Sequence, residues 1–582
     1  NGSVSRGIDR ISIIEREIGW FLNMEAAVAN GLLVTWYPVH NRWRLHELKH
    51  MWGRWDLIFD LTFKQPVNHL WHYFGSRLAF MFAWTGFYCK ALTALLIPAL
   101  ICNVFMVITY FLQEHEDLTL EVLQISFSVV IILWARTSAN RWAQETNFFV
   151  EAWNLNDDLP PVRPAYRGQL VQSSLNERDR EIQGSAVKAV VFRWISLVVT
   201  LFFCCGVLGS IYVWITLFHG RMDLVASLCL SINIKVFELV FRPVAVALTN
   251  LENHKYEFEY ANALIWKNFA FESINYYYPF IYLMVFAKYS EAGCPVVEGF
   301  GQDCIWALRR QLIGTVFFLI GVYRVVEVFM LYIVARWRLA TEDRAADGQP
   351  ARRAFMEEQA KYGQYELKDQ VETMLQLVLS LGYVVLFGSV APIVVVIIWA
   401  VFVMQLRGSA WLLAHMCRRT FPEEQLGIGA WRDALELLMV AGIFISALML
   451  VIHGEAFQGA YLLTRITFTF LFVFFSAVAW WVLAREYPDK DSETLLMERR
   501  RDYVVRKMHD LGYRAKVPQC KIIDTQNRKL VDLGRFDAIP RLDQSHPDWA
   551  AVDNTENRER NEPDIPLNRS HSALDGSHQI VP

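Results

Sequence analysis

Long hydrophobic runs alternate along the chain with short, highly charged stretches, and this pattern predicts its architecture. A bilayer core of about 30 Å requires about 20 consecutive apolar residues in a helix. Many runs reach that length, for example residues 191–218 and 428–452. A globular core can absorb one such helix, but not a long series of them. We therefore predict an all-α, polytopic membrane protein.

The runs predict about ten transmembrane helices between residues 73 and 487. In chain order they cover residues 78–112, 120–142, 189–218, 223–249, 269–288, 305–335, 369–390, 392–414, 432–453 and 462–484. Gly388 and Pro392 separate the seventh span from the eighth, because Gly and Pro favour a break in a helix.

The segments outside the spans predict a water-exposed portion at each end. Residues 1–72 indicate a small α/β portion, with a helix over 11–30 and a strand over 31–37. Residues 488–582 form a tail whose first part, 498–512, has a helical pattern. The remainder of the tail is rich in Asn, Asp, Ser and His, a composition typical of disorder.

Composition and charge agree with the membrane interpretation and add an orientation. The apolar share of 54% is high for a soluble domain, and no basic region indicates a nucleic-acid partner. Lys and Arg are absent from loop 112–119 but frequent in the loop after the second span and in loop 335–368. Because basic loops stay in the cytosol, we expect both termini in the cytosol. We expect the protein in the plasma membrane or the endoplasmic reticulum.

The fourth span carries polar residues inside an otherwise apolar run, namely Asn233, Lys235, Glu238 and Arg242. Charged residues in a membrane are costly and face protein or water. Lys235 and Glu238 are i, i+3 neighbours and can pair. One interpretation is a hydrophilic pathway for a headgroup or an ion. The other is an ion pair that only holds helices together, and the residues alone leave both open.

The fifth span contains a second group of polar residues. Asn275 and the tyrosine run 276–278 could line the same pathway. Tyrosines at a span also form the aromatic belt at the membrane interface, and that alternative stands beside the first.

One stretch has the literal pattern of a zinc peptidase. His46-Glu47-Leu48-Lys49-His50 would place two His side chains on one helix face, with Glu47 as general base. A catalytic zinc normally takes three protein ligands, and no third ligand follows nearby. The segment is basic and rich in Trp, like an amphipathic surface helix. We therefore keep a metallopeptidase as a remote alternative and expect no enzyme and no cofactor.

Two cysteines lie in the loop after the fifth span, which the charge rule places outside the cytosol. Cys294 and Cys304 could form a disulfide there, since such a compartment is oxidising. Two unpaired thiols are the alternative.

Several segments, in the right order and spacing, resemble the anoctamin family. His72–Tyr88 is similar to the family's entry into its first span, and Leu248–Glu252 matches an LTNLE-like end of the fourth. Ile274–Tyr282 is similar to an INYY-type fifth span, and Gly382–Phe387 to GFVTLF in the seventh. Tyr487–Asp489 matches the Pro-Asp that follows the tenth. The chain is identified as a divergent member of this family.

The resemblance implies a homodimer with contacts through the tenth span. It also implies a groove between the fourth and sixth spans that carries lipid headgroups or ions. The expected function is passive transport, either phospholipid scrambling, conduction of chloride or other ions, or both. A membrane tether or scaffold that transports nothing is the alternative.

The resemblance also implies a calcium site, and here the chain departs from the family. Anoctamins bind calcium with acidic side chains of the sixth, seventh and eighth spans. The sixth span has Glu327, which fits after a one-residue slip, but Arg324 lies one turn away. In the seventh span the aligned positions are Thr373 and Gln376, and only Asp369 and Glu372 lie near them.

In the eighth span the two expected acids are replaced by Val403 and Arg407. Calcium needs several oxygen ligands, so we expect a degenerate site and activity that calcium does not control. Arg407 could take the place of calcium by pairing with Glu327 or Glu372. Alternatively, it extends to the cytosolic interface, as basic residues near helix ends do.

Overall fold

The structure is a computed structural model of the full chain. It describes residues 7–514 together with 521–523 and 530–532. Within the first range it leaves out 23, 113–116, 156–161, 173–179, 219–223, 291–292, 298–300, 324, 327–329, 331, 335, 338–339, 342–353, 455–456 and 458.

The chain divides into two compact units. One comprises residues 7–500, and the other comprises residues 1–6 and 501–582. In the second unit, the described part holds the end of α17 (Ser492–Arg514) and an antiparallel hairpin of β5 (Lys521–Ile523) and β6 (Leu530–Asp532). Everything that follows concerns the unit of residues 7–500.

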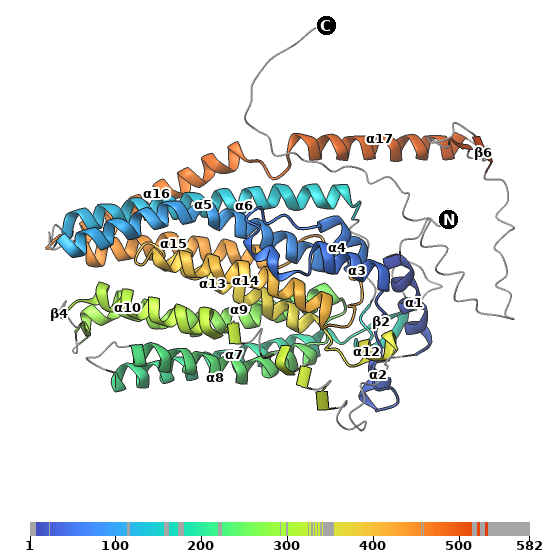
Figure 1. Ribbon diagram of the computed structural model, residues 1–582, viewed down its shortest axis with the longest axis horizontal. Coiled ribbons are helices and arrows are strands. Elements are labelled where there is room, and N and C mark those ends of the chain that lie inside the picture. Colours follow the sequence, from blue (N-terminus) through green and yellow to red (C-terminus); the bar gives the residue numbers. More distant parts are fainter. Residues whose placement is uncertain are drawn as a thin grey trace, which may run out of the picture. The chain divides into compact units, whose positions relative to one another are not determined.

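This unit is a bundle of long helices (Figure 1). In chain order these are α5 (Ser76–Leu112), α6 (Asp117–Ala152), α7 (Ala186–Leu217), α8 (Leu224–Leu251), α9 (Glu257–Ile281), α10 (Cys304–Val316), α13 (Leu367–Phe387), α14 (Ile393–His415), α15 (Trp431–His453) and α16 (Leu462–Glu486). The π-turn Tyr282–Phe286 continues α9, and the π-turn Phe317–Val322 continues α10.

Eight of the described helices are long and apolar enough to cross a membrane, which confirms the all-α polytopic class. α8 and α9 are not among the eight, although their 28 and 25 residues suffice in length. Charged side chains such as Lys235, Glu238 and Glu272 interrupt their apolar sequence. The ten expected spans therefore correspond to eight apolar helices and two that carry charges. α9 packs against α7, α8 and α13, whereas α8 buries one face and exposes large apolar side chains such as Leu239 on the other.

Two helices extend well past the predicted spans. α6 continues to Ala152 because aromatic side chains pack beyond its apolar stretch: Trp153 stacks on Trp71 with ring centroids 5.0 Å apart. α9 begins at Glu257, where Arg163 Nε donates to a carboxylate oxygen of Glu257 over 2.6 Å. Hydropathy alone locates the apolar part of a helix, not its water-exposed extension.

α13 is the centre of the bundle. It packs against α6, α9, α14 and α15, and nearly all of its side chains are buried. Tyr277 of α9 lies directly over Gly382, where any side chain would collide with its ring. The Tyr277 hydroxyl donates to the carbonyl oxygen of Leu379 over 2.8 Å. Gly382 is therefore required for the close approach of α9 to α13.

The N-terminal portion is helical, and the predicted strand over 31–37 is wrong. Its elements are α1 (Gly7–Phe21), α2 (Met24–Ala29), α3 (Arg42–Met51), the 3-10 turn Trp55–Phe59 and α4 (Val67–Phe74). Residues 31–41 form an irregular segment. Its side chains bond individually, with Arg418 to Thr35 at 2.5 Å and Tyr37 to the carbonyl of Met356 at 3.4 Å. A strand needs a neighbouring strand for its backbone groups, and the described residues offer none here.

The described strands lie elsewhere and form short antiparallel hairpins. β1 (Gln169–Gln172) pairs with β2 (Arg180–Gln183), and β3 (Val296–Val297) pairs with β4 (Gly301–Gln302). The remaining short elements are the 3-10 turn Ala287–Tyr289 and α12 (Phe355–Ala360).

A buried histidine links the N-terminal segment to the rest of the unit. His40 is 4% exposed; Nδ1 lies 2.7 Å from the Tyr73 hydroxyl, and Nε2 lies 3.1 Å from the Cys417 carbonyl oxygen. Burial lowers the pKa of His40 to about 4. The hydrogen bond to Cys417 opposes that change, and the charges of Arg419 and Lys49 add to it. The folded protein therefore holds a neutral ring where an unfolded chain takes up a proton.

We expect the free energy of unfolding to fall as the pH drops from about 6.5 to 4. In that range the unfolded state binds more protons than the folded state, so acid favours unfolding. At about 1.4 kcal/mol per pKa unit, the loss reaches about 3 kcal/mol. The thermal midpoint should therefore depend more steeply on pH in this window for the parent protein than for His40→Gln. Equal slopes would contradict this assignment.

Candidate functional site

A single buried carboxylate on α8 holds side chains from three helices. Glu238 is 2% exposed. Its oxygens accept hydrogen bonds from Lys235 Nζ at 2.7 Å and the Tyr276 hydroxyl at 2.7 Å. Gln376 Nε2 of α13 donates to it over 3.3 Å, and Arg242 forms an ion pair with it. The predicted pairing of Lys235 with Glu238 is thus part of a larger network.

Arg242 connects this carboxylate to a second one. Its guanidinium pairs with Glu238 on its own helix and with Glu372 of α13. The three side chains are only partly exposed or buried, at 22%, 2% and 29%. Buried ion pairs contribute little net stability but are costly to break. The arrangement therefore links α8 to α13 through side chains.

α9 completes the network from the opposite side. Asn275 is buried, and its Nδ2 donates to the carbonyl oxygen of Ile234 over 2.9 Å. Phe271 stacks on Phe241 of α8 with ring centroids 3.9 Å apart. Glu272 lies between these contacts along α9 and is fully buried. Sequence reasoning missed Glu272, although a carboxylate inside a predicted span is itself a signal of a functional position.

Three of the five predicted pathway residues meet in this network, namely Lys235, Glu238 and Arg242. Asn275 of α9 bonds the α8 backbone at Ile234. Asn233 instead donates from Nδ2 to Ser210 Oγ of α7 over 3.2 Å. Asn233 therefore faces a different helix pair.

The tyrosines of α9 were predicted either to line the pathway or to form an aromatic belt at the membrane interface, and they differ in burial. Tyr276 and Tyr277 are buried and hydrogen-bonded within the bundle, so they are not an interfacial belt. Tyr278 is partly exposed.

The fourth and sixth spans touch where the groove is expected. Ser227 Oγ of α8 lies 3.1 Å from the side-chain oxygen of Gln311 in α10. A Cβ added to Gly314 would lie 2.8 Å from the Ser227 Cβ, so the backbones approach closely here. Further along, the Lys235 ammonium lies 4.2 Å from the ring centre of Tyr323. At these described positions the structure shows the two helices in contact.

The acidic residues expected at a calcium site are engaged in other ways, as far as the structure describes them. Asp369 caps α13 by accepting from the Glu366 backbone N–H over 2.8 Å. Glu372 pairs with Arg242 of α8. Thr373 accepts from the Tyr365 hydroxyl over 3.3 Å. The two positions predicted on the sixth span, Arg324 and Glu327, lie outside the described residues.

Arg407 has a partner other than the two predicted ones. Its guanidinium lies 3.7 Å from a carboxylate oxygen of Asp60, in the N-terminal segment that folds over α14. Glu372 is taken by Arg242. Arg407 is 2% exposed, and Glu327, the other predicted partner, lies outside the described residues. The acid, Asp60, belongs to the N-terminal segment, whereas the sequence analysis looked for a partner only within the membrane spans.

The zinc-peptidase pattern lies on a surface helix. In α3, Leu45 and Leu48 are buried, whereas His46, Glu47 and His50 are exposed. The two imidazole rings are 4.4 Å apart. Among the residues that the structure describes, no three His, Cys, Asp or Glu side chains are placed to hold a metal ion.

The structure joins Cys294 and Cys304 in a disulfide. This bond ties the loop that contains β3 and β4 to the beginning of α10.

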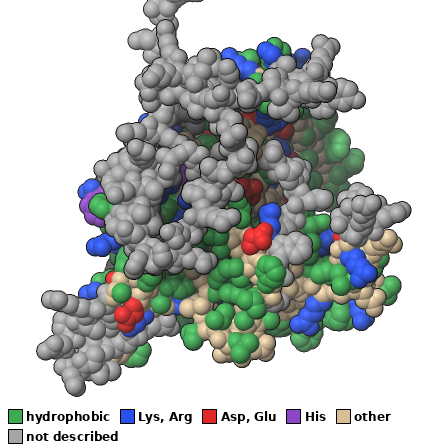
Figure 2. Space-filling view, turned by 90° about the vertical axis from the view of Figure 1, so that its right-hand side faces the viewer, with side chains coloured by type: hydrophobic (Ala, Val, Ile, Leu, Met, Phe, Trp, Pro, Cys, Tyr) green, Lys and Arg blue, Asp and Glu red, His purple; other side chains and the backbone are tan. Residues whose placement is uncertain are grey.

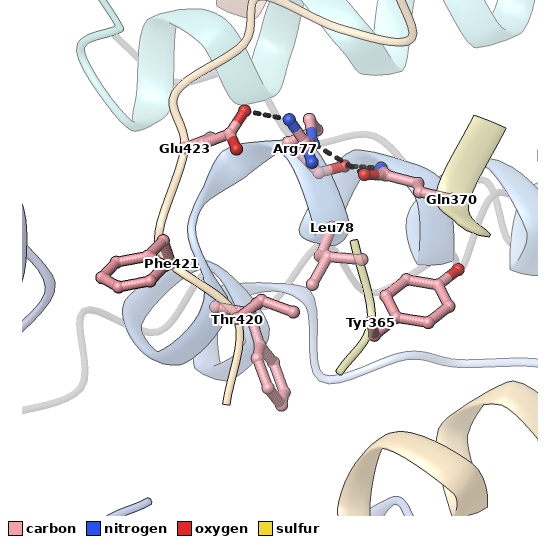
Figure 3. A pocket seen from close by; sticks show the side chains of 8 residues that line it. Arg77, Leu78, Tyr365, Gln370, Thr420, Phe421 and Glu423 are labelled. Carbon is pink, nitrogen blue, oxygen red and sulfur yellow. Dashed lines mark hydrogen bonds and ion pairs between the residues drawn. The ribbon is translucent and has the colours of Figure 1, made fainter. Parts of the chain in front are cut away.

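A small pocket at the start of α5 is lined by polar and apolar side chains (Figure 3). Arg77 lies between Glu423, with which it forms an ion pair, and Gln370, to which its Nε donates over 2.6 Å. The backbone of Glu423 lies against Gly75, which has a φ of 92° and has no room for a Cβ. The pocket is therefore a junction between α5, α13 and the segment after α14.

The end of the bundle that carries α1, α2 and α12 has a mixed surface. Figure 2 shows Lys and Arg side chains at several places on this face, among hydrophobic ones and a few acidic ones. This is the side on which the charge rule places the basic loops.

Comparison with known proteins gives one consistent result. A family profile described as "Anoctamin: Calcium-activated chloride channel" matches residues 70–502. Anoctamin-10 of Mus musculus is 23% identical over 453 residues, 72% of this chain and 62% of that protein. Anoctamin-8 of Mus musculus is 24% identical over 45% of this chain and 25% of that protein. Anoctamin-3 of Mus musculus is 21% identical over 78% of this chain and 53% of that protein. The chain thus spans less than two thirds of the length of these relatives.

Proposed function

The chain belongs to the anoctamin family, and from this premise we propose that it is a passive transporter of phospholipids, of ions such as chloride, or of both. The observation that supports transport is the Glu238-centred network. It places Lys235, Glu238 and Arg242 inside the membrane bundle. Charged groups in that position are costly unless they serve a polar pathway or a pair.

We propose that the pathway runs along α8 and opens toward α10. In the closed arrangement, Ser227 meets Gln311 and Lys235 covers Tyr323. Separation of α8 from α10 at these contacts would expose Lys235 and its partners to water and headgroups.

Reconstitution in liposomes tests the proposal, with lipid flip and ion flux measured on the same preparation. We expect at least one of the two activities above protein-free vesicles. Absence of both from a folded, inserted protein would support a membrane tether instead. A double variant that removes a distant ion pair, Arg136→Leu with Glu436→Leu, is the matched control and should keep the activity. That pair joins α6 to α15 at 3.4 Å.

We expect the activity to be the same with calcium chelated and with calcium added. Calcium requires several oxygen ligands, whereas Asp369 caps a helix and Glu372 pairs with Arg242. The positively charged Arg407 stands where the family has an acid. The measurement is liposome flux under both conditions. A clear increase with calcium that Glu327→Gln abolishes would show that the alignment of these spans is wrong.

Topology and assembly are part of the same proposal. We expect both termini in the cytosol and loops 112–119, 289–304 and 453–461 on the other side, in the plasma membrane or the endoplasmic reticulum. Glycosylation tags in these loops report the side directly, and a glycosylated C-terminal tag would contradict ten spans. We also expect a homodimer through α16, none of whose side chains is buried within the chain.

A further inference from the structure

The face of α9 that meets α8 carries a carboxylate that the network leaves without a partner. Glu272 is 0% exposed, and neither of its carboxylate oxygens accepts a hydrogen bond. The charges of Glu238, Arg242, Lys235 and Glu372 act on it, but the ion pairs of the described residues do not include it. Lys235 and Arg242 both pair with Glu238, and neither is bonded to Glu272. Because an ionised carboxylate buried without a bonded counter-charge is costly, a further positive charge at Glu272 would lower that cost.

Two amide oxygens of residues that bond to α8 also lack donors, and together with Glu272 and the Glu238 network they form what we call the polar layer. They are Asn275 Oδ1 and Gln376 Oε1. The amide nitrogen of Asn275 donates to the carbonyl oxygen of Ile234, and that of Gln376 donates to a carboxylate oxygen of Glu238. Glu272 and Asn275 are i, i+3 neighbours and therefore share a face of α9. The layer thus offers carboxylate and amide oxygens, the ligands that hard cations prefer.

The fixed charges of the layer favour a monovalent ligand. Two cations, Lys235 and Arg242, face three carboxylates among the described residues, Glu238, Glu372 and Glu272. One additional positive charge neutralises these five described side chains. The neutral hydroxyls that face it come from Tyr276 and Tyr277 of α9 and Tyr383 of α13.

We propose that Glu272 is the principal ligand of a buried site for one monovalent cation, with the side-chain oxygens of Asn275 and Gln376 as its neighbours. The cation is either a proton or an alkali-metal ion, since both bind carboxylate oxygen and both supply a single charge. The site would neutralise the layer in which α8, α9 and α13 meet. It does not depend on whether the chain moves lipids or ions.

The test uses the full chain purified in detergent. The thermal midpoint is measured while sodium or potassium replaces N-methyl-D-glucamine at constant ionic strength. Infrared difference spectra of the parent and Glu272→Gln then show whether this side chain is a neutral acid or a carboxylate. Glu259→Gln, on the same helix near its first turn, is the matched control. If Glu272→Gln does not fold, Glu272→Asp assigns the band by its shift.

Two results support the site and distinguish its sources. An alkali-metal ion is identified if the thermal midpoint rises with the logarithm of alkali-metal concentration. The rise must also occur in Glu259→Gln and be absent from Glu272→Gln. A neutral-acid carbonyl band that is lost in Glu272→Gln and retained in Glu259→Gln identifies a proton. An ionised Glu272 in a protein whose midpoint ignores both alkali-metal ions overturns the proposal. Such a result would leave the transport activity of the preceding section untouched.

Discussion

Glu238→Gln should lower the free energy of unfolding by about 3 kcal/mol, because it removes the charge but keeps the shape of the side chain. In the parent protein this carboxylate pairs with Lys235 and Arg242 and accepts from the Tyr276 hydroxyl. Loss of one partner leaves the others charged and poorly solvated. Breaking a buried pair is costly even where forming it contributes little.

A double-mutant cycle separates this cost from a loss of packing. Adding Lys235→Met to Glu238→Gln removes the ammonium that has lost this carboxylate, so it should recover part of the lost stability. The matched control is Glu436→Gln. It removes a carboxylate that is 54% exposed in its pair with Arg136, where the expected change is about 0–1 kcal/mol. Equal losses at Glu238 and Glu436 in the denaturant unfolding curves would mean that burial of the network has no energetic consequence.

The polar layer could be predicted on α8 because each charge there interrupts an apolar run. Lys235 and Glu238 are close in sequence, so their pairing followed from helix geometry. The second partner of Arg242 did not follow, since Glu372 lies on a different helix, α13. Asp60 reaches Arg407 in the same way, from a segment outside the spans. Helix periodicity contains no information on which distant helices become neighbours.

The errors of the sequence analysis have a common physical origin. Residues 31–37 have a strand-like pattern, but a strand forms only where another strand lies beside it. α9 was shortened to its apolar part, so Glu272 stood near the predicted end of a span and was overlooked. Hydropathy reports transfer to lipid, whereas the charges of α8 are paired within α8 and with side chains of α9 and α13.

Replacing both Lys235 and Glu238 with Leu should reduce flux by about tenfold or more while leaving the protein folded. The pair is removed together, so no net charge is created, and Arg242 keeps its ion pair with Glu372. A pathway lined by Leu in place of an ammonium and a carboxylate presents hydrocarbon to a headgroup or an ion. The resulting barrier is several kcal/mol, and about 1.4 kcal/mol already slows a step tenfold.

The measurement is lipid flip and ion flux in liposomes at equal amounts of inserted protein, with size-exclusion elution as the test of folding. The control is Arg136→Leu with Glu436→Leu, which also replaces an ion pair by two Leu side chains but lies between α6 and α15. If the Lys235–Glu238 variant transports as well as this control, the network only holds α8 against its neighbours. If flux is lost only in the Lys235–Glu238 variant, the transported lipid or ion passes these two side chains. The charges that are costly to bury would then also line the pathway.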